Sequence, residues 1–298
     1  MEEKKMYYKG KPKYQLTPKT SDWMHELFNE QSVVKGLVER YGSPINVHHL
    51  PSFNNNCEMY KQSLALGGNS ENLVLTAAIK TEPQIELAIK NGVPIILDNE
   101  DECVLTQAIA NRIGQKANVG FRISGFTVDQ EKLYSRFGFD VDEVVNFIAS
   151  YVGDNKSFDM LDVTGLHFHL DGYSTYQRSV SLVASIQIFS KLKEKGYAMS
   201  FIDIGGGILM NYLEDEKEWN TFNEQLKKSV LEDSNDITFN NNSLGFRLED
   251  GQLRGKLNTY PFFNEINKES FIRKVLDFVD DQSGLSVASL LVKNGVEL

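Results

Sequence analysis

The sequence has few cysteines, no long apolar run and a deficit of basic residues, and each shortage excludes a class of protein. The two cysteines among its 298 residues, Cys57 and Cys103, lie far apart and without metal-ligand spacing. They therefore predict neither a disulfide framework nor a metal site. No apolar run approaches the ~20 residues needed to cross a bilayer, and the N-terminal MEEKKMYYKGKPKY has no apolar signal core. We expect a cytoplasmic protein with no membrane partner.

Acidic residues outnumber basic ones. The 41 aspartates and glutamates against 31 lysines and arginines give a net charge of −10 at pH 7. Nucleic acids and anionic membranes bind basic surfaces, so this charge argues against both as partners. A hydrophobic fraction of 41% and a charged fraction of 24% are typical of a soluble chain with a substantial core.

From residue 71 onward, apolar strands alternate with amphipathic helices. The expected strands cover 73–79, 93–97, 119–123, 161–170 and 197–204. Helices are expected between Pro83 and Gly92, after Asn99, over 140–152 and 178–195, and through Trp219. Such alternation predicts parallel βαβ units, whose right-handed crossovers give a barrel or a doubly wound sheet. Five units are too few to close the eight-stranded barrel.

The remaining segments are less regular. We expect a loose arm over 1–19, a helix over 20–41 and a short strand over 44–47. Residues 234–262 have no clear periodicity and are interpreted as an insertion, followed by a helix over 268–279. The last seven residues resemble the start of a strand. These features predict two parts, an N-terminal part of residues 1–50 and a barrel domain of residues 51–298.

Two motifs stand at the ends of neighbouring strands. Gly205, Gly206 and Gly207 follow an apolar run, and glycines there allow a tight turn whose amides can bind phosphate. His167 and His169 are two residues apart and so lie on one face of the preceding strand. The alternatives without a functional role are a simple tight turn for the glycines and ordinary core or surface positions for the histidines. The pair together predicts a site for a phosphorylated cofactor.

Several segments, in their order along the chain, carry a family resemblance. They are residues 41–47, 77–82, 97–102, 121–123, 135–138, 165–169 and 202–207. With these motifs the chain resembles the fold-type III, alanine-racemase-like enzymes that use pyridoxal phosphate, and among them the diaminopimelate, ornithine and arginine decarboxylases. The resemblance implies an α/β fold, a pyridoxal-phosphate-binding TIM barrel. Here the barrel is expected to be partial, without strands 1, 2 and 8 and without the C-terminal β domain.

The resemblance also implies roles for individual residues. His169 matches the histidine that stacks on the pyridine ring, and Arg122 matches an active-site arginine, so these two are the expected catalytic residues. The three glycines match the phosphate loop. Ser174, after an unusual Asp171–Tyr173 turn, is the remaining expected phosphate ligand. The family implies an amino-acid substrate and a homodimer.

One departure concerns catalysis directly. The family's Schiff-base lysine lies in a Lys-Ala-Asn context on the first barrel strand, soon after the entry strand, and no such segment occurs at that place in this sequence. Lys80 is a tempting substitute, but the family has a lysine at this place with no such role, which favours a loop position or an ion pair. We expect a decarboxylase-like chain that is impaired. A non-catalytic cofactor-binding or regulatory protein and a fragment of a longer chain are the alternatives.

Overall fold

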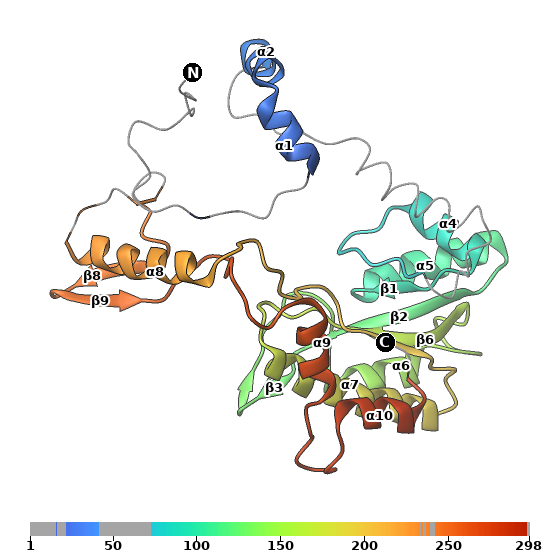
Figure 1. Cartoon of the computed structure of the whole chain (residues 1–298). Helices are drawn as coiled ribbons and strands as arrows, with labels where there is room; N and C mark the ends of the chain where they lie inside the picture. The colour runs from blue at the N-terminus through green and yellow to red at the C-terminus, as the bar shows by residue number, and fades with distance from the viewer. Residues whose placement is uncertain are drawn as a thin grey trace. The chain divides into compact units, whose positions relative to one another are not determined.

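The computed structural model describes residues 16, 22–41, 73–232, 234, 237–238 and 242–296 (Figure 1). Two compact units divide the chain, and each is described by itself. One contains the described residues of 47–208 and 269–298, and the other those of 1–46 and 209–268. In the described part of the chain, no helix combines the length and the apolar character that a membrane span requires. The expected strand at 44–47 lies outside the described residues.

A parallel sheet forms the centre of the first unit. Its strands are β1 (Ile95–Leu97), β2 (Ala117–Ser124), β6 (Leu161–His167) and β7 (Phe201–Asp203), which are neighbours in this order. The short strand β5 (Phe139–Asp140) pairs with the end of β2, and Leu75 forms an isolated parallel bridge to Ile95. The sheet confirms the expected α/β class, with part of a barrel made from parallel βαβ units.

Helices cover this sheet. They are α4 (Glu82–Asn91), α5 (Glu100–Ile113), α6 (Val144–Tyr151), α7 (Thr175–Glu194), α9 (Lys268–Leu276) and α10 (Val287–Asn294). Figure 1 shows α4 and α5 beside β1 and α6 and α7 beside β6, with α10 packed against α7. A small hairpin of β3 (Thr127–Val128) and β4 (Glu131–Lys132) completes the unit.

A row of apolar side chains crosses the four main strands of the sheet. Leu97, Phe121, Leu166 and Ile202 occupy matching positions on four neighbouring strands, and all four are fully buried. Side chains alternate between the two faces of a strand, so the next residue of each strand faces the opposite way. The apolar row therefore fixes the direction of the polar row that follows it.

The helix ends follow their sequence signals. Pro83 lies in the first turn of α4, and Gly92 ends the helix in the left-handed region at φ 69°. The Asn99 side chain accepts a hydrogen bond from the Glu102 amide at 3.0 Å, which caps α5 as expected. The Glu102 carboxylate instead accepts from the Asp98 amide at 2.8 Å.

Three expected elements differ from the structure. The strand at 73–79 is reduced to the single bridge at Leu75. The helix at 20–41 is two helices, α1 (Asp22–Asn29) and α2 (Gln31–Tyr41). The end of the chain is helical through Asn294, because the Ser286 side chain caps the start of α10 and Gly295 ends it at φ 62°.

The second unit contains the segment expected to be an insertion. It has α8 (Glu216–Leu231) and a hairpin of β8 (Phe246–Glu249) and β9 (Gln252–Gly255). Asp250 and Gly251 form the hairpin turn, at φ 51° and 73°, which is the backbone of a type I′ turn. The boundary predicted at residue 50 stays a prediction.

The buried thiol of Cys103 gives a first testable prediction. Burial, together with Glu100 and Glu102, raises the pKa of this thiol to about 12. In a Cys57→Ser background, we expect Cys103 at pH 8 to react with a disulfide reagent about a thousandfold more slowly than in the chain unfolded by denaturant, because the thiolate is the reacting form. Stopped-flow absorbance measures both rates. Equal rates would contradict the buried environment.

Candidate functional site

A row of polar side chains lies one residue beyond the apolar row of the sheet. Arg122, His167 and Asp203 pair across β2, β6 and β7, and Asp98 directly follows β1. Arg122 Nη1 lies 2.7 Å from Asp98 Oδ1, and His167 Nδ1 lies 2.9 Å from Asp203 Oδ2. The strand register thus brings two acid–base pairs to the carboxyl ends of the strands, where parallel sheets place their sites.

The glycine loop is tied to this row. Asp203 Oδ1 accepts a hydrogen bond from the Gly205 amide at 2.8 Å. Gly205 has φ 68°, and a Cβ there would lie 2.5 Å from the Phe168 carbonyl oxygen. Only glycine fits this conformation and this close approach. One carboxylate thus contacts both His167 and the loop.

His169 follows β6 and lies against the same loop. Its Nδ1 accepts a hydrogen bond from the Gly206 amide at 3.3 Å, so this nitrogen carries no proton. His167, two residues earlier, is only 3% exposed, which agrees with the alternative of an ordinary core histidine. The structure thus brings the predicted ring-stacking residue and the predicted phosphate loop into contact.

The electrostatics of the site follow from burial and from its neighbours. Burial lowers the pKa of His169, and the nearby His167, Arg122 and Arg178 lower it further against the opposing effect of Asp203. Burial alone would raise the pKa of Asp203, but its contacts with His167 and the Gly205 amide bring it below the ordinary value. The site therefore favours a neutral His169 and a charged Asp203 at neutral pH.

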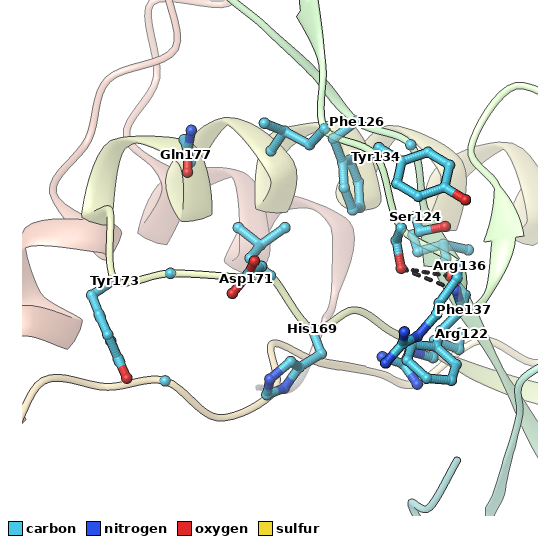
Figure 2. A pocket seen from close by; sticks show the side chains of 17 residues that line it. Arg122, Ser124, Phe126, Tyr134, Arg136, Phe137, His169, Asp171, Tyr173 and Gln177 are labelled. Carbon is cyan, nitrogen blue, oxygen red and sulfur yellow. Dashed lines mark hydrogen bonds between the residues drawn. The ribbon is translucent and has the colours of Figure 1, made fainter. Parts of the chain in front are cut away.

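A cavity of about 760 Å³ opens at these strand ends (Figure 2). Its walls come from 122–126, 133–137, 169–173, Gln177 and Gly207. Two guanidinium groups lie near the ring of Phe137, with the Cζ of Arg122 at 4.7 Å and that of Arg136 at 5.0 Å from the ring centroid. The cavity combines the predicted residues Arg122, His169 and Gly207 with positive charge on one wall.

Ser174 has a different position from the other predicted ligands. It is the N-cap of α7, and its Oγ accepts a hydrogen bond from the Gln177 amide at 3.2 Å. It is exposed and is not among the residues that line the cavity. Its role as a phosphate ligand stays a prediction.

Lys80 is engaged in a buried ion pair. The residue is 5% exposed, and its Nζ lies 2.7 Å from Glu102 Oε2 and 2.7 Å from the Ala77 carbonyl oxygen. The ion-pair interpretation of Lys80 is therefore confirmed. Among the described residues that line the cavity, none is a lysine.

Sequence reasoning missed two residues at the site. Asp98 holds Arg122, and its place directly after an apolar strand was the available signal. Arg178, on α7, is fully buried, and its guanidinium donates to the carbonyl oxygens of Ile204 at 2.5 Å and Gly206 at 2.8 Å. An arginine among the apolar positions of a core helix was the only sequence sign of it.

The lowered pKa of His169 gives a second prediction. An NMR titration of its ring is expected to give a pKa below the usual value of about 6.5. In that pH window the unfolded chain binds more protons than the folded one, so stability falls as the pH drops below about 6.5. Arg122→Gln should raise the His169 pKa, because it removes a nearby positive charge. Arg112→Gln, at an exposed ion pair, should not change it, and a wild-type value above 6.5 would contradict the site electrostatics.

Curated proteins of known and unknown activity resemble the chain. Diaminopimelate decarboxylase of Aquifex aeolicus is 26% identical over 160 residues, which are 50% of this chain and 37% of that protein. Biosynthetic arginine decarboxylase of Phocaeicola vulgatus is 28% identical over 163 residues, which cover 50% of this chain and 25% of that protein. The uncharacterized protein y4yA of Sinorhizobium fredii is 27% identical over 235 residues, which cover 78% of this chain and 45% of that protein. The chain spans less than half the length of each.

Solved structures also match. Diaminopimelate decarboxylase of Helicobacter pylori, complexed with L-lysine, is 22% identical with a TM-score of 0.44 and covers 53% of this chain and 42% of its own. Lysine decarboxylase of Selenomonas ruminantium is 19% identical with a TM-score of 0.41, covering 67% and 50%.

The match to a family model covers most of the chain. The model described as the pyridoxal-dependent decarboxylase, pyridoxal binding domain, matches residues 56–251. These residues include the whole parallel sheet, the glycine loop and the residues that line the cavity. The chain therefore belongs to the pyridoxal-dependent decarboxylase family, through its pyridoxal-binding domain.

Proposed function

We propose that this chain binds pyridoxal phosphate at the cavity beside β2, β6 and β7, as the cofactor-binding part of an amino-acid decarboxylase. The observation that carries the proposal is the hydrogen bond from the Gly206 amide to His169 Nδ1. It joins a glycine loop suited to phosphate and a flat ring suited to stacking into one site.

The residues present fit the phosphate and ring parts of this cofactor. The Gly205 amide is used by Asp203 and the Gly206 amide by His169. The Gly207 amide forms no hydrogen bond with any described residue, and Gly207 lines the cavity. A backbone donor facing a polar cavity is a suitable partner for a phosphate oxygen.

Each residue then has a defined part in the chemistry. When bound, the cofactor would supply an electron-withdrawing ring, the electron sink that loss of a carboxylate requires. His169 would pack against that ring as a neutral imidazole, because its pKa is lowered. Arg122, held by Asp98, presents positive charge to an anionic part of the substrate. The substrate class we propose is the α-amino acids with a second amino or guanidinium group, as in the names of the relatives.

We further propose that this chain does not decarboxylate an amino-acid substrate. The sequence has no Lys-Ala-Asn segment soon after the entry strand. The Lys-Ala-Asn at 116–118 lies at the start of β2, where Lys116 Nζ is 2.9 Å from Asp154 Oδ1 and 3.1 Å from Asp162 Oδ1. Lys80 is held by Glu102. These observations favour a second candidate function, non-catalytic binding of the cofactor in a regulatory protein. We also propose that the protein acts in the cytoplasm and assembles as a homodimer, which sedimentation velocity would test.

Binding and turnover are measured separately. Titration with pyridoxal phosphate, followed by its absorbance, should show saturable binding that pyridoxal without phosphate does not reproduce. Borohydride treatment followed by mass spectrometry should leave every lysine unmodified, and release of labelled carbon dioxide from lysine, ornithine, arginine and diaminopimelate should stay at background. Absence of phosphate-dependent binding would overturn the cofactor proposal. A reduced lysine adduct together with carbon dioxide release would overturn only the proposed lack of turnover.

A further inference from the structure

Arg178 is a buried cation directly beneath the glycine loop. Its side chain extends from the first turns of α7 and is fully buried. Nη1 donates to the Ile204 carbonyl oxygen at 2.5 Å, and Nη2 donates to that of Gly206 at 2.8 Å. One planar guanidinium thus holds two alternate carbonyl groups of the loop, a geometry that its fork of donors allows and a lysine cannot reproduce.

These two hydrogen bonds set the direction of the loop amides. In a trans peptide, the N–H points away from the preceding carbonyl. With the Ile204 and Gly206 carbonyl groups turned toward Arg178, the amides of Gly205 and Gly207 are turned away from it. The Gly205 amide donates to Asp203. The Gly207 amide has no acceptor among the described residues, and Gly207 lines the cavity.

The charge of Arg178 has no counterion within the described part of the chain. No carboxylate there forms an ion pair with it, and its closest ring is Phe271, 5.8 Å from the guanidinium carbon. Its Nε is buried without a hydrogen-bond partner among the described groups. Burial lowers the pKa of Arg178, which reflects the cost of an uncompensated charge. A dianion at the loop would compensate that charge.

We propose that Arg178 is a positioning residue for a phosphate monoester, which it serves by fixing the Gly207 amide toward the cavity and by supplying positive potential beneath the loop. The proposal rests on the proposed cofactor site and adds the residue that gives it phosphate selectivity. Arg178 acts through the backbone of the loop, since its guanidinium donors are directed to the carbonyl groups.

The test compares phosphate ligands with their unphosphorylated counterpart. Calorimetric affinities for pyridoxal phosphate and inorganic phosphate should fall by about ten- to a hundredfold in Arg178→Met, the loss expected for charge-assisted contacts. Pyridoxal, for which no saturable binding is expected, should behave the same with the variant as with the wild type. Arg178→Lys should recover only part of the loss, because it keeps the charge but cannot hold both carbonyl groups. Lys191→Met, which removes a positive charge from an exposed position of the same helix, should bind like the wild type.

A second measurement does not depend on the variants. In wild-type protein labelled with ¹⁵N, inorganic phosphate should shift the Gly207 amide proton downfield, whereas the Gly205 and Gly206 amides should move less. Circular dichroism shows whether Arg178→Met folds. If it does not, the phosphate-induced shift of the Gly207 amide proton and the phosphate affinity of Arg178→Lys test the role of Arg178. An unmoved Gly207 amide, or equal phosphate affinity in Arg178→Lys and wild type, would overturn the proposal. If wild type binds neither phosphate ligand, the cofactor site itself is refuted. If wild type binds both and the Arg178 variants bind equally well, only the role of Arg178 is refuted.

Discussion

Lys80→Met is expected to lower the free energy of unfolding by about 3–5 kcal/mol, the cost of breaking a buried ion pair from one side. The Lys80 side chain is fully buried and that of Glu102 is 11% exposed. Without Lys80, the Glu102 carboxylate keeps only the hydrogen bond from the Asp98 amide. Equilibrium unfolding in urea, followed by circular dichroism, gives the difference in free energy.

Two further variants separate the buried pair from lysine removal in general. Lys90→Met removes a lysine from an exposed pair with Glu86 on α4, where solvent screens the charges, and should change stability little. The double variant Lys80→Met/Glu102→Leu should recover part of the loss, because it leaves no unpaired charge in the core. If Lys80→Met and Lys90→Met were equally stable, Lys80 would not be in a buried ion pair, and its amine would again be a candidate for cofactor attachment.

Gly205→Ala is expected to weaken pyridoxal phosphate binding by at least about tenfold and to destabilise the fold by about 1–3 kcal/mol, the cost of a strained backbone. Gly205 has φ 68°, and an added Cβ would lie 2.5 Å from the Phe168 carbonyl oxygen and 2.9 Å from His169 Nδ1. The loop must therefore move away from His169. Absorbance titration and thermal unfolding measure the two effects.

Gly206→Ala is the matched control for that prediction. Gly206 does not have a left-handed backbone, and the nearest atom to an added Cβ is His169 Cε1 at 3.6 Å, an ordinary contact. It should bind pyridoxal phosphate within a fewfold of the wild type. If the two variants lost affinity equally, side-chain bulk would explain the result, and the backbone conformation of the loop would not.

The parts of the fold with local signals could be predicted from the sequence. Asn99 and Gly92 mark helix ends through their own backbone and side-chain chemistry, and the structure has them there. Apolar runs predicted the strands of the sheet, because a buried strand needs apolar side chains within a short stretch of sequence. The hairpin turn at Asp250-Gly251 also had a local signal, since Asp-Gly favours a type I′ turn, but the irregular pattern around it concealed that signal.

The contacts that complete the site could not be predicted in the same way. Arg122 was expected at the site, yet its pairing with Asp98 depends on the register of β1 and β2, two strands separated by α5. Arg178 contacts Ile204 and Gly206, 26 and 28 residues further along the chain. Such contacts follow from how α7 packs on the sheet, and no pattern within a short window of sequence contains that information.

Helix α7 also links the loop to the end of the described chain. Near its start, Ser179 Oγ lies 3.3 Å from the Val275 carbonyl oxygen of α9. Near its end, the Ser190 hydroxyl donates to the Asn294 side chain of α10 at 2.7 Å. Segments separated by about a hundred residues thus share one rigid support with Arg178. Native-state hydrogen exchange should therefore find the glycine loop and α10 opening together, as a single cooperative unit.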